Sequence, residues 1–187
     1  MSNLVQRTIT GIIFLVVVIG AILFNKYSFL ILFLIIVAGS LYEFYTLSRK
    51  EGIQPSIIYG ISTGLMIFVA NFLYVNDVLP GKYFLLLIPL IAGIFIIELY
   101  KNTEHPFTNI GFTILGLVYI AVPLSLANQI VTDNTVNYNA GLLLGFFILI
   151  WSYDTLAYVF GVSFGKHRLF ERISPKKSWE GFIGGSL

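Results

Sequence analysis

Apolar residues fill six long stretches of this chain, and short polar segments separate them. A helix needs about 20 apolar residues to cross a hydrocarbon core about 30 Å thick. Six transmembrane helices are therefore predicted, at residues 8–24, 28–47, 57–74, 83–100, 107–127 and 139–160. The segment Phe182–Leu187 predicts the start of a seventh. The pattern predicts an all-α polytopic membrane protein, with residues 1–187 forming a single transmembrane domain.

Composition agrees with a membrane protein. The chain is 57% hydrophobic and 11% charged, whereas soluble domains carry about 25% charged residues. Cysteine is absent, which excludes a disulfide, a zinc–thiolate site and a cysteine nucleophile. The first stretch resembles a signal peptide because Arg7 precedes it, but no small-x-small cleavage site follows Phe24. Because the next span begins almost at once, we expect an uncleaved membrane anchor.

Lysine and arginine are distributed unevenly between the two sides of the predicted bundle. Lys26 and Lys82 fall on the side opposite the N-terminus. The other basic residues fall on the N-terminal side: Arg7, Arg49, Lys50, Lys101, Lys166, Arg168, Arg172, Lys176 and Lys177. Basic residues concentrate on the cytoplasmic side of membrane proteins. We therefore expect a cytoplasmic N-terminus and a cytoplasmic basic loop at residues 161–181, in the inner (plasma) membrane of the cell.

Three pairs of glycines have the Gly-x-x-x-Gly spacing that lets helix backbones approach closely. These pairs are Gly60/Gly64, Gly141/Gly145 and Gly181/Gly185. Because glycine is common in this chain, we expect close packing at some of these pairs and not at all of them.

Three acidic residues lie toward the predicted cytoplasmic ends of even-numbered spans. For Glu43 and Glu98 we favour a simple interfacial placement, in which the carboxylate reaches water. Asp154 differs because residues 156–160 continue the apolar span beyond it. A carboxylate well inside a span costs about 2.5–3.5 kcal/mol on insertion scales. We therefore expect Asp154 to serve a partner, an ion or a substrate.

Polar and aromatic neighbours share a helix face with Asp154. Trp151, Asp154, Thr155 and Tyr158 stand at positions i, i+3, i+4 and i+7, which lie on one side of a helix. A lipid-facing stripe would not carry a carboxylate and a hydroxyl together. We expect this face to look into the protein or into a wet cavity.

The segment after this span combines glycine, basic residues and a predicted helix start. Gly161 and Gly165 flank the expected turn out of the membrane. In Ser174–Lys177, serine is placed as an N-cap and proline as the first helical residue. A helix N-terminus favours anions, and two lysines there are unfavourable unless an anion offsets them. The pattern predicts a site for a nucleotide phosphate, a lipid phosphate or the anionic leaflet; topology alone would also explain the charge.

Other familiar sites are missing from the sequence. No pair of residues has a convincing metal-ligand spacing, and neither His105 nor His167 has a second candidate ligand at such a spacing. The chain has no Walker P-loop, no Gly-x-Ser-x-Gly elbow and no HExxH motif. From the residues alone, the prediction is a membrane protein with a cytoplasmic anion-binding face.

The stretch from Trp151 to Gly181 resembles the phosphatidate cytidylyltransferase (CDP-diacylglycerol synthase) family. The matching positions are Trp151, Asp154, Thr155, Ala157, Tyr158, Gly161, Phe164, Gly165, Lys166, His167, Ser174, Pro175, Lys177, Ser178, Glu180 and Gly181. The first 150 residues match in hydropathy, in the N-terminal arginine and in Glu43. The resemblance is therefore dense over about thirty residues and general elsewhere.

The resemblance implies transfer of CMP from CTP to phosphatidate, giving CDP-diacylglycerol and diphosphate, with Mg²⁺ as cofactor. It implies catalytic roles for Asp154 and Lys177, and binding of nucleotide or lipid phosphates by Lys166, His167, Ser174, Lys176 and Lys177. Supporting roles fall to Trp151, Thr155, Tyr158 and Glu180. The expected partners are CTP, phosphatidate and membrane lipids, without nucleic acid, and a homodimer is among the assemblies that the resemblance allows.

Two departures from the family pattern change the expectation. Val162 stands where the family usually has lysine or arginine, so one basic contact is missing. The family's metal-binding aspartates lie in motifs farther along than Leu187. We therefore expect a chain that represents about the N-terminal two-thirds of a member, is inactive alone, and leaves the Mg²⁺ ligands beyond Leu187.

Two other functions stay open at this stage. A related CTP-dependent lipid kinase, acting on a polyprenol or phytol, would have the same basic loop and a neutral lipid acceptor. A non-enzymatic transporter or scaffold would contact anionic lipid without using CTP.

Overall fold

The structure is a computed structural model that describes residues 3–132, 136–170, 172 and 174–186. Its Cα packing divides the chain into two compact units, Met1–Ala140 and Gly141–Leu187. Each unit is described below by itself.

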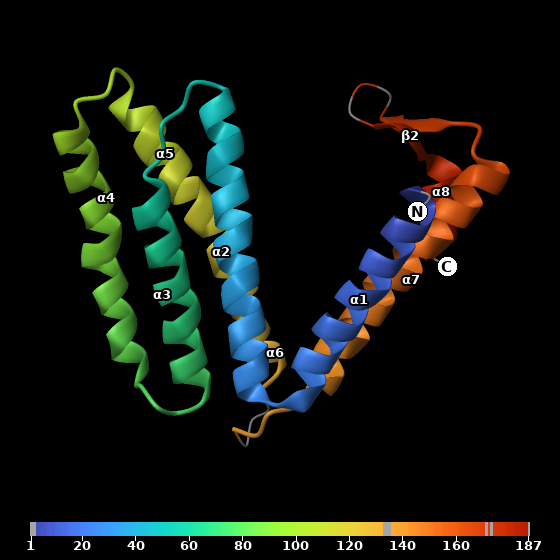
Figure 1. Cartoon of the computed structure of the whole chain (residues 1–187), viewed down its shortest axis with the longest axis horizontal. Coiled ribbons are helices and arrows are strands. Elements are labelled where there is room, and N and C mark those ends of the chain that lie inside the picture. The colour runs from blue at the N-terminus through green and yellow to red at the C-terminus, as the bar shows by residue number, and fades with distance from the viewer. Residues whose placement is uncertain (1–2, 133–135, 171, 173, 187) are drawn as a thin grey trace. The chain divides into compact units, whose positions relative to one another are not determined.

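The first unit is helical. Its elements are α1 (Asn3–Phe24), α2 (Lys26–Lys50), α3 (Ile57–Val75), η1 (Gly81–Leu86), α4 (Leu87–Lys101), α5 (Pro106–Gly116), η2 (Leu117–Ala121) and α6 (Val122–Ile130). The short η1 is a 3-10 turn that leads into α4, and η2 is a π turn that joins α5 to α6 without a break. Helix α3 packs against α2, α4, α5 and α6 (Figure 1).

Five helical stretches are long and apolar enough to cross a membrane. They are Lys26–Lys50, Ile57–Val75, Gly81–Lys101, Pro106–Ile130 and Gly141–Phe164, and Thr8–Phe24 forms a shorter apolar helix. Each of the six predicted spans therefore falls on a helix, and the chain is a helical multi-pass membrane protein. The finer count, six crossings and the start of a seventh, stays a prediction.

Close packing between α2 and α3 follows from a row of apolar side chains facing glycines. Residues at four-residue spacing on α2 are buried: Phe29, Phe33, Val37, Leu41 and Tyr45. A Cβ at Gly60 of α3 would lie 2.6 Å from the Tyr45 hydroxyl oxygen, so a side chain there does not fit. At Gly145, by contrast, a Cβ would meet no atom within 4 Å. The glycine spacing thus marks a close contact at Gly60 and none at Gly145.

The second unit consists of two helices joined by a short antiparallel hairpin. Its elements are α7 (Gly141–Phe164), β1 (Arg168–Phe170), β2 (Ser174–Ser178) and α8 (Trp179–Ser186). Arg168 pairs with Ser178 and Phe170 with Ser174. Helix α8 packs along α7 (Figure 1). Within the described residues this hairpin is the main departure from the predicted all-helical chain.

The predicted helix start at Ser174 is wrong, because Ser174–Ser178 is a strand and the helix begins at Trp179. The residue before a proline is pushed toward extended conformations, which suits Ser174 to a strand. The cap is Ser178, whose hydroxyl accepts the Gly181 backbone N–H at 3.2 Å, the usual N-cap geometry. Glu180 then lies in the first turn, where a negative charge is favourable.

The turn out of the membrane was also placed too early. Helix α7 continues through Gly161 to Phe164, and the Gly165 N–H still donates to the Gly161 carbonyl at 3.1 Å. The helix therefore ends at Phe164, one turn later than the predicted end of the span at residue 160.

Candidate functional site

Small residues hold the start of α8 against the end of α7. A Cβ at Gly181 would lie 2.7 Å from the Ala157 carbonyl oxygen and 3.1 Å from the Gly161 Cα. A Cβ at Gly165 would lie 2.8 Å from the Ser178 hydroxyl. Because neither glycine has a Cβ, the two helices approach at backbone distance. The residues that follow α7 are thereby fixed beside the first turn of α8.

Glu180 binds the backbone and the ring of the segment after α7. Its carboxylate accepts the Lys166 N–H at 3.1 Å and the His167 N–H at 3.2 Å. The His167 Nδ1 lies 2.7 Å from the same carboxylate. The His167 carbonyl in turn accepts the Trp179 N–H at 3.0 Å. Two segments that are 13 residues apart in sequence are thus connected from both sides.

These contacts also set the charge of Glu180. The hydrogen bond from His167 lowers the pKa of the Glu180 carboxyl to about 2, with further help from backbone N–H groups. The carboxylate is therefore ionised at neutral pH and acts only as a hydrogen-bond acceptor.

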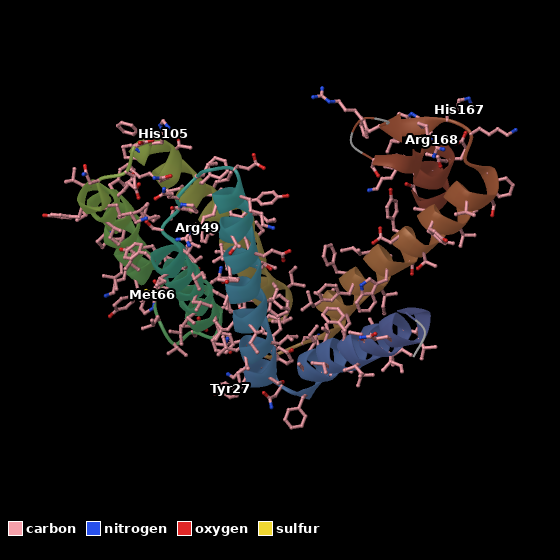
Figure 2. All side chains as sticks on the ribbon, turned by 45° about the horizontal axis from the view of Figure 1, so that its top comes forward. Tyr27, Arg49, Met66, His105, His167 and Arg168 are labelled. Atoms are coloured by element: carbon pink, nitrogen blue, oxygen red, sulfur yellow. The ribbon has the colours of Figure 1, made fainter. Side chains whose placement is uncertain are left out.

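An open hollow lies beside this contact. Its lining residues are Lys166, His167, Arg168, Trp179 and Ile183. Figure 2 shows His167 and Arg168 on the segment that follows α7. The lining of the hollow thus combines two permanent cations and a histidine with an indole and an aliphatic side chain. Such a lining suits an anion that carries an apolar or aromatic portion.

The structure brings some of the predicted phosphate-binding residues together and leaves others apart. Lys166 and His167 line the hollow, whereas Ser174 and Lys177 lie on β2 outside its lining. Lys177 is exposed and Ser174 is partly buried. The side chain of Lys176 lies outside the part of the chain that the structure describes. Arg168 was not among the predicted site residues, although it shares the hollow with Lys166 and is the next basic residue after it.

Asp154 lies farther back along α7. It precedes the last helical residue, Phe164, by ten residues, or about 15 Å along the helix axis. It does not line the hollow. Asp154 and the basic segment are therefore two separate parts of the predicted site.

The polar face of α7 is left uncovered by α8. The α8 glycines contact Tyr153, Ala157, Phe160 and Gly161, which are partly buried positions of α7. Asp154, Thr155 and Tyr158 are exposed and Trp151 is partly buried. The Thr155 hydroxyl donates to the Trp151 carbonyl at 2.7 Å. That this face looks into the protein or a wet cavity stays a prediction.

The interfacial placement expected for Glu98 is wrong. Glu98 is 2% exposed and forms an ion pair with Lys101 at 3.2 Å. It also accepts hydrogen bonds at 2.6 Å from the Thr103 hydroxyl and from the Asn109 amide. Burying the Glu98 carboxylate costs less free energy because charged and neutral donors surround it. The i, i+3 spacing of Glu98 and Lys101 was a signal in the sequence. Glu43 is exposed within its unit, and its interfacial placement stays a prediction.

The Glu98 cluster extends to the loop between α2 and α3. Lys101 donates to the Ser56 hydroxyl at 2.7 Å, and Asn109 accepts the Gln54 N–H at 2.7 Å. The Ser56 N–H donates to the Thr113 hydroxyl at 3.0 Å. We call Gln54, Ser56, Glu98, Lys101, Thr103, Asn109 and Thr113 the Glu98 cluster. It joins the ends of α4 and α5 to a loop about fifty residues earlier.

The part of the chain that the structure describes does not gather ligands for a metal. No group of three or more His, Asp or Glu side chains lies close enough to hold an ion. Glu180 is occupied by His167 and backbone N–H groups, and Asp154 is the single acidic residue of α7. Within the described residues, the protein alone therefore supplies no ready-made group of three such ligands.

Comparison with known proteins gives a consistent result. The model of the cytidylyltransferase family matches residues 5–187. A phosphatidate cytidylyltransferase from Haemophilus influenzae is 30% identical over 200 residues, which cover 97% of this chain and 68% of that protein. A phosphatidate cytidylyltransferase from Bacillus subtilis is 26% identical over 99% of this chain and 68% of its own length.

A third relative is similar over a shorter region. The phosphatidate cytidylyltransferase from Rickettsia felis is 30% identical over 138 residues, 74% of this chain and 56% of that protein. The chain thus spans between about half and two-thirds of the length of these relatives. No solved structure matches the chain.

Proposed function

The chain belongs to the cytidylyltransferase family, and we propose that it takes part in the synthesis of CDP-diacylglycerol from CTP and phosphatidate. An oxygen of the phosphatidate phosphate would attack the α-phosphorus of CTP. The bond from that phosphorus to the β-phosphate oxygen would break, and diphosphate would leave with the electron pair. Because the chain spans only part of its relatives, the proposal concerns the protein that contains these residues.

One observation carries the proposal. The residues from Trp151 to Gly181, which resemble the family in sequence, form a single packed unit of α7, the hairpin and α8. In this unit Lys166, His167 and Arg168 line a hollow. Phosphoryl transfer needs cations that spread phosphate charge and little covalent chemistry from the protein. The hollow supplies such cations and has room at its edge for a ligand with an apolar part.

We assign residue roles from this arrangement. Lys166, with Arg168 beside it, would bind phosphates of the nucleotide in the hollow. Lys177 would approach the same ligand from β2, and Ser174 would position the strand. Phosphate binding is also proposed for Lys176 because the resemblance implies it. Asp154 would act about 15 Å deeper along α7, on the membrane side, by orienting a lysine or a water molecule.

The cofactor and the cellular setting complete the proposal. Mg²⁺ is proposed as the cofactor because the resemblance implies it, and we assign none of the described residues to the ion. The reaction would take place at the cytoplasmic face of the inner membrane, with the N-terminus and the hairpin on that side. A homodimer is included in the proposal as an assembly to be tested.

Labelled CTP tests the function directly. The protein is produced from its complete reading frame and given phosphatidate, Mg²⁺ and CTP labelled at either the α- or the γ-phosphate. We expect the α label in the lipid and the γ label in diphosphate, with both products abolished by a chelator. A γ label on a lipid alcohol would show a lipid kinase instead. Phosphatidate binding without any transfer would favour a scaffold.

A further inference from the structure

We propose that Glu180 is a positioning residue that presents His167 to a phosphate group in the hollow. This inference rests on the proposed function and deepens it, because it gives Glu180 and His167 separate tasks at the same site. The phosphate could belong to the nucleotide or to the lipid, and the experiment below separates the two.

The two nitrogens of the His167 ring have different surroundings. Nδ1 lies 2.7 Å from the Glu180 carboxylate. Because an ionised carboxylate has no proton to give, Nδ1 must carry the hydrogen of this contact. The side chain is nevertheless 79% exposed and lines the hollow. The contact with Glu180 therefore fixes one edge of the ring and leaves Nε2 for a ligand.

Glu180 also fixes the backbone on which this ring stands. Its carboxylate accepts the N–H groups of Lys166 and His167, so the main chain and the ring are held by one side chain. The backbone of Glu180 is held in turn, because α8 begins at the Ser178 cap and packs on α7 through Gly181. A ring restrained at both points loses less conformational freedom when a ligand binds.

The surrounding charges favour an anion as that ligand. Lys166 and Arg168 line the same hollow, and Lys177 extends from β2, the strand that pairs with β1. Glu180 is the single acidic residue of α8, and its carboxylate already has partners; Asp154, on α7, is outside the hollow. A phosphate at Nε2 would favour the ring with both nitrogens protonated. Such a ring donates one charge-assisted hydrogen bond to Glu180 from Nδ1 and a second to the phosphate from Nε2.

This arrangement predicts that phosphate binding is coupled to a proton on the ring. Loss of one charge-assisted hydrogen bond weakens binding about ten-fold. Glu180 remains ionised from pH 6 to 8, so a pH dependence that Glu180→Gln removes would come from the ring that Glu180 holds. We therefore expect the phosphate ligand to bind more tightly at pH 6 than at pH 8.

The experiment compares four proteins produced from the complete reading frame: wild type, His167→Ala, Glu180→Gln and the double variant. Glutamine keeps an oxygen for the two backbone N–H groups and removes the charge that orients the ring. Glu51→Gln is the control, because Glu51 is an exposed glutamate of the first unit. Two readouts are measured from pH 6 to 8: equilibrium binding of CTP, and KM for CTP and for phosphatidate with kcat.

We expect each single variant to weaken binding of one substrate three- to ten-fold at pH 6 and to flatten its pH dependence, with kcat much less affected. The double variant should bind no more weakly than His167→Ala, because Glu180 acts through His167. A rise in KM for CTP alone identifies a nucleotide phosphate, and a rise for phosphatidate alone identifies the lipid. Titration of CTP itself is common to all proteins and cancels in the comparison.

Other results would overturn the inference. Additive losses in the double variant, or a Glu180→Gln protein with unchanged pH dependence, would mean that Glu180 is structural. Reduced yield of folded Glu180→Gln with normal KM in the remainder would mean the same. If the wild type binds CTP with the expected pH dependence but transfers no CMP, the proposed function fails and the phosphate contact of His167 stands.

Discussion

Two glutamates in this chain each accept several hydrogen bonds, in opposite surroundings. Glu98 is 2% exposed, and its partners are side chains of the Glu98 cluster. Glu180 lies partly exposed in the first turn of α8, and its partners are two backbone N–H groups and an exposed ring. The buried carboxylate completes an internal network, whereas the partly exposed one holds a ring that lines an open hollow. Burial and the type of donor therefore distinguish these two contacts better than the presence of an ion pair does.

The largest effect should come from breaking the buried pair. Glu98→Ala leaves Lys101 and Asn109 without their shared acceptor, and loss of one partner of a buried pair costs about 3 kcal/mol or more. We expect a clear fall in the thermal unfolding temperature of the detergent-purified protein. Glu43→Ala is the control, because Glu43 is exposed on α2, and equal effects of the two changes would contradict the structural role of Glu98.

Asp154 is a third carboxylate, and it has no buried partner among the described residues of its unit. Its substitution therefore separates an effect on activity from an effect on stability. We expect Asp154→Asn to reduce CMP transfer about 100-fold, as for a residue that orients a proton-transferring group. The unfolding temperature should change little, since Asp154 is exposed within its unit. Transfer rates and thermal unfolding of the same preparation measure both. Near-normal transfer would assign Asp154 a structural role.

The packing under Glu180 can be changed without touching the carboxylate. Gly181→Ala places a Cβ 2.7 Å from the Ala157 carbonyl oxygen, and such overpacking costs about 1–3 kcal/mol. We expect faster proteolysis within residues 165–178 and reduced CTP binding. Gly145→Ala, in α7, is the control: its Cβ would meet nothing within 4 Å, so the change should be neutral or slightly stabilising. The idea fails if both variants behave alike.

The smallest expected effect is a pH dependence of the hairpin. The pKa of Glu180 is lowered to about 2 in the folded state, against about 4.3 in an unstructured chain. Its contribution to stability is therefore complete above that ordinary value and is lost as the pH falls toward 2. The protection of the Lys166 and His167 amides relative to intrinsic exchange should fall between pH 5 and 2.5. In Glu180→Gln the same amides should show no such acid-dependent change beyond intrinsic exchange.

The sequence predicted the helices well because their signal is local. Each predicted span is a continuous apolar run, and in a membrane a helix satisfies its own backbone hydrogen bonds. Lys166 and His167, which were predicted to bind phosphate, line a hollow directly after the end of α7, and their phosphate binding stays a prediction. The exit of α7 was misplaced by one turn because Gly161 resembles a break, although its carbonyl still accepts the Gly165 N–H.

The errors concern contacts that no local pattern contains. Ser174 and Ser178 both precede helix-compatible residues, and only pairing with β1 makes Ser174 a strand residue and Ser178 the cap. The i, i+3 spacing of Glu98 and Lys101 was visible in the sequence, whereas the contacts of Lys101 with Ser56 and of Asn109 with Gln54, which complete the buried cluster, join distant positions. The role of Glu180 depended on knowing that its first-turn carboxylate faces Lys166 and His167. In each case a tertiary contact decided between two interpretations that the local sequence fits equally well.

The sequence distances in the two clusters have a consequence for the order of assembly during synthesis. Contacts of Glu180 join residues 13 or 14 positions apart, so they can form as soon as one short segment has left the ribosome. The Glu98 cluster joins residues 45 to 57 positions apart, and it must wait until α5 has been made and inserted. Contacts that are close in sequence form faster than distant ones. We therefore expect nascent chains that end before α5 to hold Glu98 without its amide partner, a stage at which membrane quality control would meet an incompletely neutralised carboxylate.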